Sequence, residues 1–149
     1  MRFALVAVLF CLCIQVSASS EQQAMRVVGD AIVAPFSDVR GSAEEGEQIF
    51  AARDAGHCVL CHQVSSLDAP FQGNIGPALS GIGDRLSPAQ IRLRIADASL
   101  LNAQTIMPSY YRTKGLHRVD ERYKGRTALS GAQIEHLVTY LTQLRSQNQ

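Results

Sequence analysis

The sequence is poor in cysteine, in net charge and in long apolar runs, and each shortage narrows the possible functions. Two of its four cysteines, Cys11 and Cys13, fall in the first 18 residues, which leaves Cys58 and Cys61 for the rest of the chain. A zinc site would need two further ligands at similar spacing, and no other cysteine is present to supply them. The sequence shows no internal repeat, and no strand pattern matches its helical patterns in strength. We therefore expect one all-α domain without a zinc site.

Net charge gives no indication of a partner. If Arg2 is removed with a signal peptide, the Lys and Arg count falls from 14 to 13, which equals the 13 Asp and Glu residues. A neutral chain lacks the general electrostatic attraction that nucleic-acid binding needs. We therefore expect no nucleic-acid partner.

The first 18 residues are typical of a secretory signal peptide. Arg2 provides a positive start, an apolar run extends from Phe3 to Ile14, and Val16-Ser17-Ala18 fits a cleavage site. A membrane anchor is the weaker alternative, because a spanning helix needs about 18 apolar residues and this run is interrupted after Ile14. We expect an exported, periplasmic protein that is cleaved near Ala18 and has no membrane anchor.

The run Cys58-Val59-Leu60-Cys61-His62 is the strongest motif in the chain. Outside the cytoplasm, Cys-x-x-Cys-His is the attachment site of a c-type haem, in which each thiol adds to one vinyl group of the porphyrin. The histidine after the second cysteine lies beneath the iron as its proximal ligand. A thioredoxin-like redox pair should instead follow a strand in a βαβ pattern, which this sequence lacks. We expect one covalent haem c on Cys58 and Cys61, with His62 as an iron ligand.

Residues 19–41 form an extension before the domain of residues 42–149. The extension lacks helical periodicity, and Pro35 prevents a regular element. Its large apolar side chains are Val27, Val28, Ile32, Val33 and Phe36. A disordered tail would be poorer in such side chains, so the extension packs either on its own domain or on a partner. We predict that it contacts a partner subunit.

The first predicted helix begins at the capping box Ser42-Ala43-Glu44-Glu45 and ends near Gly56. It presents Gly46, Ile49 and Phe50 on one side. Because Gly46 has no side chain, a second helix can approach its backbone closely. We expect the first and last helices of the domain to cross at this position.

Two more helices are predicted from the same kinds of signal. One begins at Ser87-Pro88-Ala89-Gln90, where serine caps the helix and proline takes the first helical position, and it runs to about Asp97. The last helix follows the capping box at Ser130. Its apolar residues at helical spacing are Ile134, Leu137, Val138, Leu141 and Leu144.

The turn Gly73-Asn74-Ile75-Gly76-Pro77-Ala78-Leu79-Ser80-Gly81 resembles the Gly-Pro-x-Leu-x-Gly segment of class I cytochromes c. The resemblance implies that the Pro77 carbonyl accepts the remaining ring hydrogen of His62, as the outer partners of metal-bound histidines do. It also implies that Leu79 packs against the porphyrin.

Met107 is the candidate for the second axial ligand of the iron. A thioether is a soft, neutral donor, and Met107 lies in a long segment, residues 99–128, that lacks periodicity of its own. Such a segment needs a functional tether in a compact domain, and an iron ligand would provide one. The rival ligands are Met25, His57, His117 and His136.

The stretch from Arg112 to Arg126 is locally basic. It holds Arg112, Lys114, Arg118, Arg122, Lys124 and Arg126 against Asp120 and Glu121. Such a patch could neutralise haem propionates, or could steer an acidic partner or an anionic substrate. A plain solvated loop is an equally good interpretation.

Across nearly the whole mature chain, the sequence resembles the SoxX family, the monohaem subunits of periplasmic SoxAX cytochromes. The resemblance lies in Gly-Asn-Ile-Gly-Pro at 73–77, Leu-Arg-Ile-Ala-Asp at 93–97, Thr-Ile-Met-Pro-Ser-Tyr-Tyr at 105–111, Gly-Leu-His-Arg-Val at 115–119 and Tyr-Lys-Gly at 123–125. A departure is Ala103, where the family commonly has proline. Generic carrier cytochromes share only the first of these segments.

This resemblance implies a class I cytochrome c domain over residues 42–149, with His62 and Met107 as axial ligands. It also implies a heterodimer with a SoxA-like subunit, which holds the catalytic haem where thiosulfate is joined to a carrier-protein cysteine. No catalytic residue is then expected on this chain, which would accept electrons and pass them to a downstream acceptor. The alternatives are a freestanding soluble electron carrier and a structural haem subunit of another periplasmic enzyme.

Overall fold

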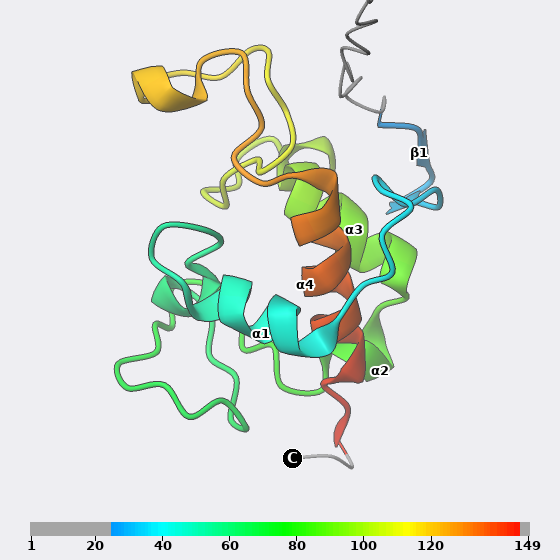
Figure 1. Ribbon diagram of the computed structural model, residues 1–149, viewed down its shortest axis with the longest axis vertical. Helices are drawn as coiled ribbons and strands as arrows, with labels where there is room; N and C mark the ends of the chain where they lie inside the picture. Colours follow the sequence, from blue (N-terminus) through cyan, green and yellow to red (C-terminus); the bar gives the residue numbers. More distant parts are fainter. Residues whose placement is uncertain (1–24, 147–149) are drawn as a thin grey trace, which may run out of the picture.

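The computed structural model describes residues 25–146, and its regular secondary structure is almost entirely helical (Figure 1). Its helices are α1 (Ala43–Ala51), α2 (Ile82–Arg85), α3 (Pro88–Asp97) and α4 (Gly131–Gln143). Single 3₁₀ turns are η1 (Cys58–Leu60), η2 (Ala98–Leu100) and η3 (Glu121–Tyr123). Within the described range no helix has the length and apolar character of a bilayer span. The expected all-α class is confirmed, whereas the predicted signal peptide of residues 1–18 lies outside the described residues.

The helix starts follow the serine caps read from the sequence. Ser87 and Ser130 each accept a hydrogen bond from the backbone N–H three residues later, and the side chains of Gln90 and Gln133 accept from the backbone N–H of these serines. Ser42 accepts from Glu45 N at 3.3 Å and so caps α1. These caps satisfy backbone N–H groups that have no partner inside the helix, which fixes where each helix begins.

Helix α1 ends at Ala51, so the predicted end near Gly56 is wrong. The chain turns back after Ala52, and Gly56 N donates to Ile49 O at 3.1 Å. A Cβ on Gly56 would lie 2.8 Å from that same carbonyl oxygen, which only glycine avoids. The tight turn places Gly56 beside Cys58, since a Cβ on Gly56 would also lie 3.1 Å from the Cys58 sulfur.

Helices α1 and α4 cross at Gly46, as the sequence predicted (Figure 1). A Cβ on Gly46 would lie 2.6 Å from Tyr140 Cβ and closer still to the His136 carbonyl oxygen. One turn along, the Phe50 ring meets the Tyr140 ring at a centroid distance of 5.7 Å. The missing side chain therefore allows the two helices to approach at backbone distance.

The N-terminal extension packs on its own domain through two of its apolar side chains. It contains a hairpin of β1 (Val27–Val28) and β2 (Ala31–Ile32), so the expectation of no regular element is wrong. Ile32 is 1% exposed and Phe36 is 7% exposed, and the Phe36 ring stacks on Tyr111 at 4.0 Å. Val33 points outward and is 67% exposed. The contact predicted with a partner thus does not involve Ile32 or Phe36.

A buried ion pair fastens this extension to α3 and α4. Arg92 on α3 donates twice to the Glu135 carboxylate on α4, with both distances 2.7 Å. Arg92 also donates to Ile32 O at 2.8 Å, and Phe36 N donates to Glu135 at 3.0 Å. Two buried charges are tolerated when they are paired and their remaining positions are satisfied. The backbone of the extension supplies that satisfaction here.

Phe36→Ala is expected to destabilise the protein by about 3–5 kcal/mol, the range for emptying a buried aromatic site. The loss has two sources, because the substitution leaves a cavity and removes the stack on Tyr111. Denaturant unfolding of the holoprotein measures it. Val33→Ala is the matched control in the same segment, and it should stay within about 0.5 kcal/mol because the side chain is exposed. Equal effects of the two substitutions would show that the extension does not pack as described.

Candidate functional site

The site is an apolar cavity of about 930 Å³ between the helices and the irregular segments that follow α1 and α3. Its floor includes buried side chains of the core, namely Phe50, Ile91, Ile95, Leu137 and Leu141. Its rim brings together the Cys58–His62 motif, the turn at residues 75–79 and residues 102–108. Apolar pockets for cofactors are typically about 300–1,000 Å³, so this cavity has room for a large one.

Cys58 and Cys61 enter this cavity on the single turn η1. His57 before the turn has a left-handed backbone (φ 46°), and Cys61 N then donates to Cys58 O at 3.1 Å. His62 N donates to the same Cys58 oxygen at 2.9 Å. This turn places both thiols and the following imidazole along one side of the cavity. Burial raises the pKa of the Cys58 thiol to about 12.

The orientation of His62 is set by Pro77. His62 Nδ1 lies 2.8 Å from the Pro77 carbonyl oxygen, and a carbonyl can only accept a hydrogen bond. The proton therefore sits on Nδ1, and Nε2 keeps its lone pair for a metal. Gly76 lies against the ring, because a Cβ there would come within 2.7 Å of Nδ1. The imidazole is thus held in one orientation from two sides.

The turn that carries Pro77 is itself tied to the cysteine motif. Gly76 N donates to Cys61 O at 2.8 Å, and Leu79 N donates to Gln63 O at 2.8 Å. Gly73 N donates to Val59 O at 2.9 Å. Leu79 lines the cavity and packs against the core. The structure therefore brings together the cysteines, His62, Pro77 and Leu79 in one wall.

Met107 also lines the cavity, on the segment that follows α3. Its backbone N donates to Thr105 Oγ1 at 3.2 Å. Three residues later Tyr110 O–H donates to Gly56 O at 2.7 Å, which ties this segment to the turn before Cys58. Burial raises the pKa of Tyr110 above its usual range, so the hydroxyl remains a donor.

The rival ligands differ in their access to the cavity. Among the lining residues of the described chain, His57 is present and Met25, His117 and His136 are not. His136 Nδ1 accepts a hydrogen bond from Ser42 N at 2.9 Å, in the crossing of α1 and α4. Met25 packs against the outside of the core, and His117 is exposed. His57 stands directly before Cys58, on the wall that already holds His62.

The positive charges at the cavity come from α2 and α3. Arg85 and Arg94 line it, whereas none of the six basic residues at 112–126 does. Arg85 donates to Ala78 O at 3.0 Å, and Arg94 pairs with Asp30 of the hairpin at 3.4 Å. Sequence reasoning missed both arginines and had assigned a possible propionate-neutralising role to the basic loop. Arg94 lies in the Leu93–Asp97 segment of the family resemblance, so that segment was the available signal.

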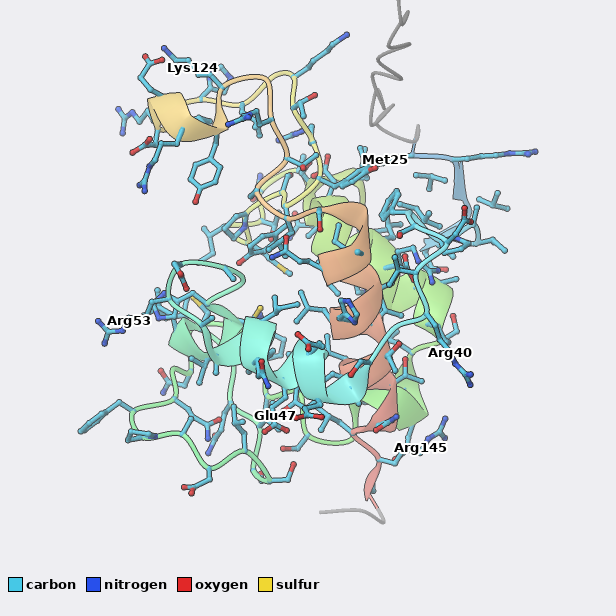
Figure 2. All side chains as sticks on the ribbon, in the orientation of Figure 1. Met25, Arg40, Glu47, Arg53, Lys124 and Arg145 are labelled. Atoms are coloured by element: carbon cyan, nitrogen blue, oxygen red, sulfur yellow. The ribbon has the colours of Figure 1, made fainter. Side chains whose placement is uncertain are left out.

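Arg112 lies beside Asp97 at the end of α3, and the part of the basic loop around Lys124 stands away from the helices (Figures 1 and 2). Several of its charges are used locally. Arg122 pairs with Asp120 at 3.0 Å, and Lys124 pairs with Glu121. Tyr123 is the residue of this part that lines the cavity.

Comparison with known proteins agrees with this geometry. The family model described as cytochrome c matches residues 43–145. The chain belongs to the cytochrome c family. The expected class I cytochrome c fold is therefore confirmed. As a member of this family, the chain binds haem c covalently. Cys58 and Cys61 fit its attachment motif.

One solved structure similar to this cytochrome c is a chain of SoxXA from P. pantotrophus. The two sequences are 34% identical, and the match covers 82% of this chain and 95% of that chain with a TM-score of 0.73. The search of curated proteins gave no match. The structural likeness thus extends over nearly the whole of the similar chain and is not restricted to the haem motif.

The residues present fit a covalent haem. The cavity is apolar, both thiols and the oriented His62 share one wall, and Met107 and two arginines complete its lining. Gly76 also fits this assignment, because any side chain at that position would overlap the His62 ring that is to bind the iron.

Proposed function

We propose that this chain is the electron-accepting monohaem subunit of a SoxAX-type complex in the periplasm. The observation that carries the proposal is the likeness to a chain of SoxXA, at 34% identity and 0.73 TM-score, around a cavity with His62 and Met107. In this proposal the mature chain begins near Ser19, and the cytochrome c domain occupies residues 42–149.

Each lining residue has a specific role in holding the cofactor. Cys58 and Cys61 would form the two thioethers, while His62 and Met107 would bind the iron. Pro77 fixes the tautomer and orientation of His62, and Leu79 packs on the porphyrin. When bound, the haem takes up and releases one electron, and methionine ligation raises its potential, which suits an acceptor.

Electron counting supports a non-catalytic role for this chain. Joining thiosulfate to a cysteine thiol forms one S–S bond, releases the thiol proton and leaves two electrons to be removed. One haem takes one of them, and Cys58 and Cys61 are both consumed as thioethers. The partner therefore carries the sulfur chemistry of an L-cysteine S-thiosulfotransferase, and this chain passes electrons on to a downstream acceptor.

Exposed apolar side chains at the mouth of the cavity provide a surface for a SoxA-like partner. Leu60, Ile75 and Ile106 all line the cavity and are 57%, 66% and 80% exposed. A specific heterodimer typically buries about 1,200–2,000 Å² in total, and apolar groups at its centre contribute most of the affinity. A partner on this surface would also bring its own redox site close to the cofactor edge.

Co-expression with a SoxA-like cytochrome tests the proposal. The two chains should co-purify as a heterodimer, and Ile106→Glu should weaken the complex by about tenfold or more, because a charge in a dry interface is left unpaired. Phe71→Glu is the matched control, since Phe71 is fully exposed but does not line the cavity. The haem spectrum of each variant establishes that the site itself is intact. A chain that purifies alone and donates electrons directly to an oxidase would be a freestanding carrier.

A further inference from the structure

Asp97, the last residue of α3, is 0% exposed. The other buried charged residues in the described chain, Arg92 and Glu135, satisfy each other in a two-bond pair. Asp97 has no such pair. Arg112 Nε lies 3.4 Å from Asp97 Oδ2, and within residues 25–146 neither of these atoms has a hydrogen-bond partner.

A carboxylate is unfavourable at this position for two reasons. The C-terminus of a helix carries the negative end of the helix dipole, which repels an anion. Burial adds a desolvation cost that a loosely aligned arginine offsets only in part. An apolar or amide side chain would avoid both costs, so the carboxylate needs a specific reason to be there.

That reason lies in the donors to Asp97 Oδ1. Ser99 Oγ and Ser109 Oγ each donate to it at 2.5 Å, and Ser99 N donates at 3.2 Å. Arg112 in turn donates to Ser99 Oγ at 3.1 Å. One oxygen atom thus fastens both ends of the segment 99–109, which carries Met107 between them.

Other bonds continue this attachment beyond Ser109. Tyr111 N donates to Ala96 O at 3.1 Å, and Leu129 N donates to Tyr110 O at 3.0 Å. The segment 99–109 itself has no helix after η2, so its shape depends on such closures. Among them, the Asp97 carboxylate is the charged group, and hydrogen bonds to a charged group are the stronger kind.

We propose that Asp97 is a positioning residue that fixes Met107 over the cavity by closing the 99–109 segment through Ser99 and Ser109. The inference rests on the proposed role of Met107 as an iron ligand. When the segment is closed, the Met107 sulfur is held at the cavity. A small added ligand such as imidazole then has to displace a methionine whose backbone cannot move out of the site. With the closure removed, the same displacement becomes easier.

Binding of imidazole to the oxidised holoprotein, followed by absorbance, measures this effect. Ser109→Ala removes one bond to the carboxylate, and Asp97→Asn removes the charge. Each should raise the apparent affinity for imidazole by about tenfold, the equivalent of one charge-assisted hydrogen bond. The matched control is Ser65→Ala, whose hydroxyl pairs with Ser80 at 2.9 Å on the proximal side, and it should leave the affinity within about twofold.

The two proposals fail in different ways. A methionine bound to ferric haem iron gives a weak near-infrared charge-transfer band. If wild-type protein shows this band but Ser109→Ala and Asp97→Asn bind imidazole no better than wild type, Asp97 is only a structural residue and this inference is wrong. The same conclusion follows if Ser109→Ala lowers global stability without changing imidazole affinity, and this variant keeps the test decisive should Asp97→Asn not fold. If the wild-type protein has no such band, the ligand role of Met107 is itself wrong, and this inference falls with it.

Discussion

Replacing Met107 by alanine is expected to abolish the weak near-infrared charge-transfer band of the oxidised protein, while the haem stays covalently attached. The band arises from a sulfur–iron bond, and Met107 is the methionine that lines the cavity in the described chain. Attachment is unaffected because it depends on Cys58 and Cys61, which lie in a different segment of the chain from Met107. The reduction potential should fall by on the order of 0.2 V, within the roughly 0.8 V range that axial ligands span.

Met25→Ala is the matched control for this experiment. Met25 packs against the core from the hairpin side and does not line the cavity. Its loss should cost some stability and leave the band and the potential unchanged. A band that persists in Met107→Ala would move the second ligand elsewhere, and His57 would then be the first candidate because it lines the cavity.

The parts of the fold that were predicted correctly are those with local causes. A serine cap with a glutamine three residues later specifies a helix start whatever the rest of the chain does, as at Ser87 and Ser130. The end of α1 was misplaced because it depends on a tight turn at Gly56. Helix α2 was missed since four residues carry too little periodicity to read.

The docking of the N-terminal extension depends on partners far away in sequence. Phe36 N binds Glu135, 99 positions later, and Arg92 reaches back 60 positions to Ile32 O. No spacing rule connects such residues, so the sequence left own-domain and partner packing equally open. The exposed side of the same segment, including Val33, is still available for the predicted partner contact.

The candidate site likewise contains residues that the sequence predicted and residues that it did not. The Cys58–His62 motif and the Pro77 turn are short patterns with a fixed chemical meaning, and the structure places them at one wall of one cavity. Arg85 and Arg94 reach the site only through the packing of α2 and α3, and Asp97 contacts the 99–109 segment through Ser99 and Ser109. Their roles depend on which face of a helix meets the cavity, and a family resemblance alone did not assign them.

The double substitution Cys58→Ala with Cys61→Ala is expected to prevent a folded holoprotein from accumulating. The two sulfurs are the covalent anchors of the cofactor, and the cavity they serve is bordered by core residues of α1, α3 and α4 such as Phe50, Ile95 and Leu137. Without anchorage, the cofactor is lost and these side chains face an empty space.

The size of the cavity indicates how much stability the double variant should lose. The cavity of about 930 Å³ is far larger than the gap left by one large-to-small substitution in a core, and even one such gap costs about 2–5 kcal/mol. Losing the cofactor contacts of several core side chains at once is therefore comparable with the roughly 5–15 kcal/mol that stabilises a domain. The expected readouts are loss of cooperative thermal unfolding and of most helical circular dichroism in whatever chain is recovered. Each single substitution keeps one thioether and should yield some holoprotein. The two single variants are therefore controls for the effect of the alanines themselves. A double variant that melts cooperatively as a helical apoprotein would show that the core holds together without its cofactor.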